Sequence, residues 1–120
     1  MTAAKIPAAL RSAAEAFAAT RRISLTHAAG YEAACAHIPC PRSVSAESIA
    51  TYSAQRVEAA RAAGYTAAAG GELHRAMVAA RAEMLRAAAP LLRRPELRAL
   101  KSADAATQAD AILRALDVVS

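Results

Sequence analysis

Residues 71–89 read GELHRAMVAARAEMLRAAA, and this stretch decides the fold class. Its apolar positions are spaced by four, three, four and four residues, at Leu73, Met77, Ala80, Met84 and Ala88. That spacing follows the 3.6-residue period of an amphipathic α-helix. Pro90 comes next, and proline lacks the backbone N–H that a continuing helix needs. The sequence therefore predicts a helix that runs from Gly71 to Ala89.

The N-terminal part of the chain carries the same period. Its apolar residues Ile6, Leu10, Ala13 and Phe17 are spaced by four, three and four, which predicts a helix over residues 7–20. Ser24 is a candidate N-cap for a second helix over residues 25–38. A single helix that continues through both ranges is the alternative. Pro39 and Pro41 end the segment in either case.

Further helices are expected towards the C-terminus. Ser45 followed by Glu47 predicts a capped helix that ends at Gly64. This helix carries Ile49, Tyr52, Ser53, Val57 and Ala60 at helical spacing. Pro95 opens a short helix to Lys101. Ser102, followed by Asp104, caps a last helix. The apolar face of that helix consists of Ala105, Ala109, Ile112, Leu113, Leu116 and Val119.

Composition supports an all-α protein. Ala, the best helix former, supplies 38 of the 120 residues, whereas the chain has only four Gly, four aromatic residues and no Trp. These counts exclude an all-β fold, and no apolar run is long enough to span a bilayer. We therefore expect one helical domain over residues 1–120, a compact bundle of four to six short helices with an Ala-rich core.

Such a core is thin, because Ala buries little apolar area. Leu, Ile, Val and Phe together supply 21 residues. We therefore expect marginal stability, with burial completed by self-association or by a protein partner.

The net charge of +5 is concentrated in two segments. Residues 1–22 carry +3 and residues 86–101 carry +4, whereas residues 23–85 are balanced and residues 102–120 carry −2. The second basic segment also contains Pro90 and Pro95, which interrupt its helicity. We predict that it binds a partner through Arg86, Arg93, Arg94, Arg98 and Lys101. An acidic protein fits this segment, and a nucleic acid is the alternative.

The excess of Ala and Arg is typical of GC-rich bacterial coding, including that of mobile elements. The acid-poor N-terminus is similar to a transit peptide, but Glu15 and the helical pattern argue against one. Two Cys do not make a disulfide framework. We expect a cytoplasmic protein with no cofactor.

One cluster could ligate zinc, because Cys35, His37 and Cys40 lie within six residues. If the helix reaches Ile38, however, Cys35 and His37 lie about 200° apart around its axis. We therefore predict that no metal binds there.

A second motif is RISLTH, residues 22–27. It resembles the Arg-φ-x-x-x-His signature of HEPN-type helical ribonucleases. The resemblance implies that Arg22 binds the scissile phosphate and that His27 transfers protons. In most of that family the motif lies on a later helix, whereas here it is near the start. A surface arginine pair beside a histidine at a helix start is the alternative interpretation.

Residues 45–65 could also form the second helix of a helix-turn-helix. Their charge is balanced, with Glu47 and Glu58 beside Arg56 and Arg61, whereas recognition helices carry positive charge. We therefore rank a non-enzymatic helical interaction protein first, and a HEPN-like ribonuclease and a DNA-binding regulator after it.

Overall fold

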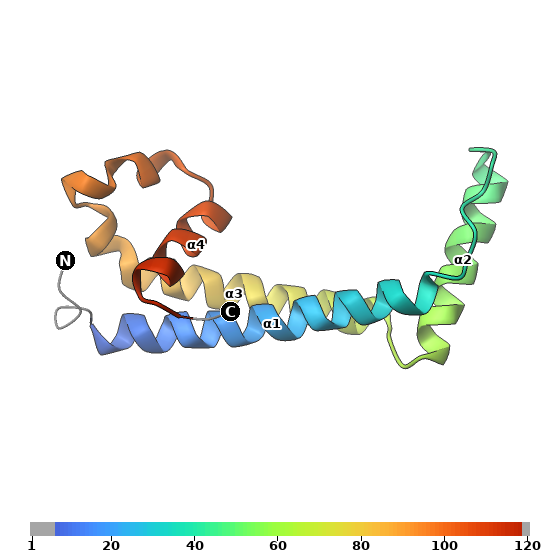
Figure 1. Ribbon diagram of the computed structural model, residues 1–120, viewed down its shortest axis with the longest axis horizontal. Helices are drawn as coiled ribbons and strands as arrows, with labels where there is room; N and C mark the ends of the chain where they lie inside the picture. The colour runs from blue at the N-terminus through green and yellow to red at the C-terminus, as the bar shows by residue number, and fades with distance from the viewer. Residues whose placement is uncertain (1–6, 119–120) are drawn as a thin grey trace. The chain divides into compact units, whose positions relative to one another are not determined.

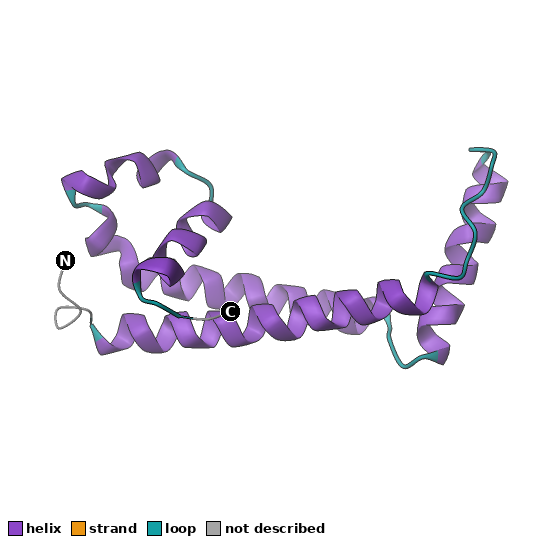
Figure 2. Cartoon of the chain, viewed as in Figure 1, coloured by secondary structure: helices purple, strands orange, loops and turns teal. Residues whose placement is uncertain are grey.

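The chain is all-α. The computed structural model describes residues 7–118, apart from the side chains at positions 96–98, and within this part every regular element is a helix (Figure 2). The elements are α1 (Ala8–Cys35), α2 (Ala46–Ala62), α3 (Ala67–Leu92), the 3-10 helix η2 (Pro95–Ser102) and α4 (Ala105–Ala115). Two of them, with 28 and 26 residues, are longer than the short helices expected from the sequence. Ile6 and Val119, assigned to apolar faces, lie outside the described residues.

The first two predicted helices form one continuous helix, α1, so Ser24 is not an N-cap. The segment 20–25 contains no proline or glycine that would break a helix. The hydroxyl of Thr20 donates to the carbonyls of Ala16 and Phe17, one turn earlier on the same helix. Gly30 lowers helix propensity by about 1 kcal/mol relative to Ala, but it does not interrupt the helix.

Helix α2 begins and ends as predicted. The Ser45 hydroxyl accepts a hydrogen bond from the Ser48 N–H at 3.1 Å. At the other end Gly64 has a φ of +94°, which glycine adopts without steric penalty. Of the residues at helical spacing along it, Ile49 and Val57 are exposed.

Helix α3 is longer at both ends than predicted. It begins at Ala67, where the Thr66 hydroxyl accepts the Ala69 N–H at 3.1 Å. It also continues through Pro90 to Leu92, so Pro90 does not end it. A proline removes its own N–H and leaves those of the following residues intact, which allows this last turn to form.

After α3, η2 opens with Pro95 as expected, but it is a 3-10 helix. The cap of α4 is Asp104 and not Ser102, because the Asp104 carboxylate accepts the Thr107 N–H at 2.7 Å. The Gln108 side chain donates to the Leu100 carbonyl at 2.6 Å and ties η2 to α4.

The chain divides into two compact units, each built from segments of more than one helix. Unit 1 comprises Met1–Arg22 and His74–Ser120, and unit 2 comprises Ile23–Leu73. In unit 1, the early turns of α1 and the later turns of α3 pack with α4 (Figure 1).

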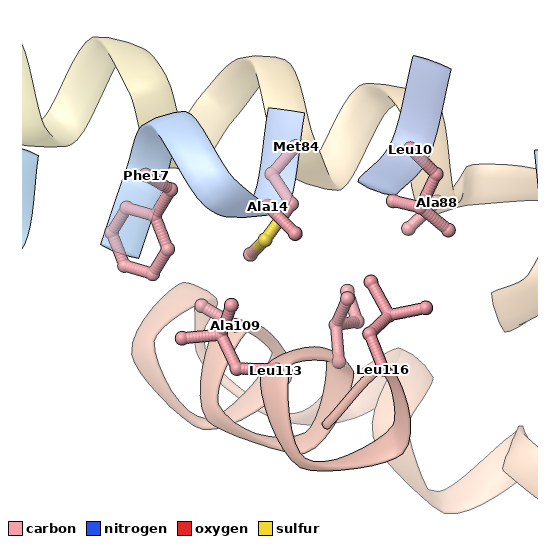
Figure 3. Packing of buried hydrophobic residues seen from close by; sticks show 9 residues of the cluster. Leu10, Ala14, Phe17, Met84, Ala88, Ala109, Leu113 and Leu116 are labelled. Atoms are coloured by element: carbon pink, nitrogen blue, oxygen red, sulfur yellow. The ribbon is translucent and has the colours of Figure 1, made fainter. Parts of the chain in front are cut away.

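The core of unit 1 joins these three helices (Figure 3). Phe17, Leu10 and Met84 are its largest fully buried side chains. Ala also contributes, and it supplies five of the twelve buried apolar residues in the described part of the chain. The cluster consists of Leu10, Ala14, Phe17, Met84, Ala88, Ala109, Ile112, Leu113 and Leu116.

Unit 2 has far less buried apolar surface. Of the buried residues that the structure describes, it holds only Cys35 and Ala60. The Cys35 thiol donates to the Arg56 carbonyl at 3.2 Å, and the Arg56 guanidinium pairs with Glu32 at 2.7 Å. Polar contacts therefore supply much of what joins α1 to α2.

Candidate functional site

The basic segment at residues 86–101 spreads over three elements. Arg86 lies on α3 and pairs with Glu83 one turn earlier. Arg93 and Arg94 occupy the turn that follows α3, and Lys101 is exposed on η2. The side chain of Arg98 lies outside the described part. The described members of the predicted set therefore surround one corner of unit 1.

Charge differs strongly between the two units. Residues 23–73 hold three Arg against four Glu, which gives unit 2 a formal net charge of −1. The remaining residues hold twelve Arg and Lys against six Asp and Glu, which gives unit 1 a net charge of +6. The net positive charge of the chain thus belongs to unit 1.

An apolar cavity of about 90 Å³ lies at the same corner of unit 1. Its walls come from the last turn of α3, from η2 and from α4, and the Gln108–Leu100 hydrogen bond holds two of these walls together. The lining side chains are almost entirely hydrocarbon. They are Leu91, Leu92, Leu100, Ala111, Ile112, Ala115 and Leu116.

Two arginines from α1 reach α4 close to this cavity. Arg11 donates to the carbonyl of Leu116, a lining residue, at 3.4 Å. Arg21 pairs with Asp110 at 2.7 Å, which neutralises the carboxylate next in sequence to Ala111. Arg11 therefore adds a cation beside a lining residue of the cavity, and Arg21 compensates the charge of Asp110.

Unit 2 carries the exposed apolar side chains. In the described part of the chain, all five exposed large apolar residues belong to it, with exposed fractions from 41% to 88%. Ile49 and Val57 lie two turns apart on α2, beside the face that contacts α1. The set is Ile23, Leu25, Val44, Ile49 and Val57.

An open groove of about 420 Å³ lies beside the first turns of α2. Pro39 and Pro41 form one side, and the other side is mostly hydroxyl and amide groups. Those groups come from Ser45, Ser48, Thr51, Tyr52 and Gln55, with Glu47 at the helix start. The groove is shallow and combines no charged pair with a nucleophile, so we assign it no chemistry.

His27 lies in the middle of α1 and not at a helix start. Its ring meets that of Tyr65 edge to face, with centroids 5.3 Å apart. Its Nε2 is buried and has no hydrogen-bond partner among the described residues. Arg22 is exposed and lies five residues earlier, which corresponds to about 140° around a helix axis. Helix α1 therefore does not place the two residues of the HEPN-like motif on one face.

The three residues considered for zinc are not brought together. Cys35 is buried against α2, whereas Cys40 is exposed and His37 is exposed in the turn after α1. Nowhere in the described residues do three or more His, Cys, Asp and Glu side chains gather in a way that could hold a metal ion.

Helix α2, the candidate recognition helix, has its cations engaged within unit 2. Arg56 pairs with Glu32 and Arg61 with Glu58. The hydrogen bond to Glu32, and a weaker one to Tyr52, raise the pKa of Arg56 above its ordinary value. A helix whose positive charges are neutralised in this way has little to offer a phosphate backbone.

Among the described residues, no helix combines the length and the apolar character that a membrane crossing requires.

Comparisons with protein-family models, with curated proteins and with solved structures give no match for this chain.

Sequence reasoning missed both the cavity and the exposed apolar set of unit 2. A partial signal existed for the second, since Leu25 lies away from the apolar stripe of α1. The sequence contained no signal for the cavity, because the position of its walls depends on how η2 packs against α4.

Proposed function

We propose that this protein is a non-enzymatic helical interaction module that binds another protein or a second copy of itself. The observation that carries the proposal is the surface of unit 2. Large apolar side chains are exposed there, while its own core buries little. A partner that covers these side chains would supply the apolar burial that unit 2 lacks by itself.

The basic corner of unit 1 supports the proposal through a separate observation, its positive charge. Its charges increase the rate of encounter with an acidic partner and select against a basic one. Exposed charges of this kind add little to affinity by themselves. We therefore assign binding energy to the apolar side chains of unit 2. Arg93, Arg94 and Lys101 of unit 1 favour acidic molecules as partners.

The test replaces two exposed apolar residues of α2 and measures association. The variant Ile49→Ser with Val57→Ser removes apolar surface, and Ala50→Ser with Ala54→Ser is the control on exposed positions of the same helix. Light scattering on the purified full chain measures self-association. Co-purification from the native host, with proteins and nucleic acids both identified, measures association with other molecules.

We expect the Ile49/Val57 variant to lose the oligomer or the protein partner, while the Ala50/Ala54 control keeps it. An association that survives the loss of both apolar side chains contradicts the proposal. Recovery of RNA or DNA as the only bound molecule also contradicts it, and supports the ribonuclease or DNA-binding alternatives instead.

A further inference from the structure

The apolar cavity of unit 1 carries a separate inference, which does not depend on the surface of unit 2. We propose that this cavity is a binding pocket for one aliphatic side chain of an acidic protein segment. Its size, its lining and the charges around it each restrict the occupant.

Size limits the occupant to a single small apolar group. The cavity volume of about 90 Å³ is smaller than an engineered cavity of about 150 Å³ that takes up benzene. A Leu, Ile, Val or Met side chain fits that volume, whereas a complete lipid chain does not. Peptide segments that bind to apolar grooves place side chains of this kind in them as anchors.

The lining excludes polar occupants. Of the seven lining residues that the structure describes, four are Leu, one is Ile and two are Ala. None of these seven side chains can form a hydrogen bond with a hydroxyl or a charged group. A buried polar group without a partner is destabilising. The occupant must therefore be hydrocarbon where it enters the pocket.

The charges around the pocket then restrict which residues can flank the bound side chain in the partner. Arg93 follows the lining residue Leu92, Lys101 follows Leu100, and Arg114 precedes Ala115. Arg11 joins them through its hydrogen bond to the Leu116 carbonyl.

In the described part, two carboxylates are next in sequence to lining residues, and the charge around the pocket stays positive. Asp110 is paired with Arg21, and Asp117 is exposed beyond the end of α4. Acidic residues on either side of the bound side chain complement the pocket.

The pocket lies where three elements of unit 1 meet, and its described lining includes the exposed residue Ala115. Helix α3 ends at Leu92, and η2 turns away after Ser102. Leu116 and Ile112 belong both to the pocket and to the core of unit 1. A bound side chain would therefore extend that core outward, which gives binding and folding stability a common origin.

The experiment is a selection from a displayed library of random 12-residue peptides against the immobilised full-length protein, followed by NMR. We expect enriched peptides to be acidic and to share one aliphatic position. Replacing that residue by Ala should weaken binding about tenfold or more. On titration with an enriched peptide, the methyl signals of Leu91, Leu92, Leu100 and Ile112 should shift.

Two variants fill the pocket, Ala115→Leu and Ala111→Met, and each should abolish binding. The matched control is Ala106→Leu, which places the larger side chain at an exposed position of α4 that does not line the cavity. Circular dichroism and the melting temperature establish that each variant is folded. Changing Arg93, Arg94 and Lys101 to Gln should weaken binding about tenfold at low salt and less at high salt.

Several results would overturn the proposal. They are the enrichment of basic or uncharged peptides, no enrichment at all, methyl shifts confined to unit 2, or unchanged binding by folded Ala115→Leu and Ala111→Met proteins. A DNA or RNA duplex that shifts the pocket methyl signals when no peptide does would also overturn it. The surface of unit 2 is intact in every variant, so failure here leaves the proposed function standing.

Discussion

Tyr65 lies directly over Gly30, and its ring occupies the space in which a side chain at position 30 would begin. The same ring contacts His27 edge to face, one turn earlier on α1. Gly30 is therefore required by the close approach of Tyr65 and not by an unusual backbone conformation. This contact links the end of α2 to α1 within unit 2.

Replacing Gly30 by Ala should destabilise the protein in spite of the better helix propensity of Ala. The new methyl group forces the Tyr65 ring away from His27, and such overpacking costs about 1–3 kcal/mol. In a Tyr65→Ala background the clash is absent, so Gly30→Ala should there stabilise by up to about 1 kcal/mol. Urea unfolding of the four proteins measures both effects. The same sign in both backgrounds would show that Tyr65 does not restrict position 30.

At the C-terminal ends of α2 and α4, we expect that removing a glycine lowers stability and that introducing one raises it. Both form a Schellman motif, with Tyr65 N–H bonded to the Ala60 carbonyl and Val118 N–H to the Leu113 carbonyl. The left-handed position is Gly64 in the first and Asp117, with a φ of 56°, in the second. Asp117→Gly should stabilise by about 0.5–1 kcal/mol, and Gly64→Ala should destabilise by about 1 kcal/mol.

Thermal unfolding of these two variants checks the pair. A Cβ at position 64 meets no atom within 4 Å, so any loss there comes from the backbone and not from a clash. Equal melting temperatures for Asp117→Gly and the parent protein would contradict the assignment.

Truncation of Phe17 should cost far more than truncation of Leu25, although both lie on α1. Phe17 is 1% exposed and belongs to the core of unit 1, whereas Leu25 is 62% exposed. Phe17→Ala should lose about 3–5 kcal/mol of unfolding free energy, and Leu25→Ala less than about 0.5 kcal/mol. Denaturant titration measures both. Comparable losses would mean that Leu25 is covered in solution.

Asp104 makes stability depend on pH in the acid range. Its pKa is lowered from 3.8 by the backbone N–H and the side chain of Thr107. A group whose pKa is lower in the folded state stabilises above its unfolded pKa, and this stabilisation is lost as the pH falls through the folded pKa. Asp104→Asn keeps an N-cap of similar quality without the titration.

The melting temperature of the parent protein should therefore fall more steeply below about pH 3.8 than that of Asp104→Asn. Measurements between pH 7 and pH 2 test this directly. Parallel curves for the two proteins would show that the Asp104 cap does not respond to pH.

Periodicity predicted the all-α class because every helix carries its own local signal, and Ser45 and Pro95 marked two helix starts correctly. The helix boundaries that were predicted wrongly depend on competing interactions, and the residue type at one position does not show which of them is stronger. Pro90 removes one hydrogen bond, and the helix still continues to Leu92. Ser102 and Asp104 are both good caps, and the side chain that reaches an N–H group is that of Asp104.

The predicted functional residues fared differently. Arg22 and His27 were singled out because their spacing resembles the Arg-φ-x-x-x-His signature, and their role stays a hypothesis. The sequence did not reveal that His27 packs against Tyr65. Whether the basic segment binds a partner stays a prediction. The apolar cavity beside it could not be predicted, because it depends on the tertiary contact between Leu100 and Gln108.

The two thiols of unit 2 differ in accessibility by a wide margin, although only five residues separate them. Cys40 is exposed, whereas Cys35 is buried with its Sγ against the Arg56 carbonyl. A thiol-specific reagent should therefore modify the chain in two phases. The rate of the slow phase measures how often α1 separates from α2, because Cys35 reacts only after its contact with Arg56 opens. The rate at which Cys35 is modified thus reports the local opening of unit 2 without an engineered label.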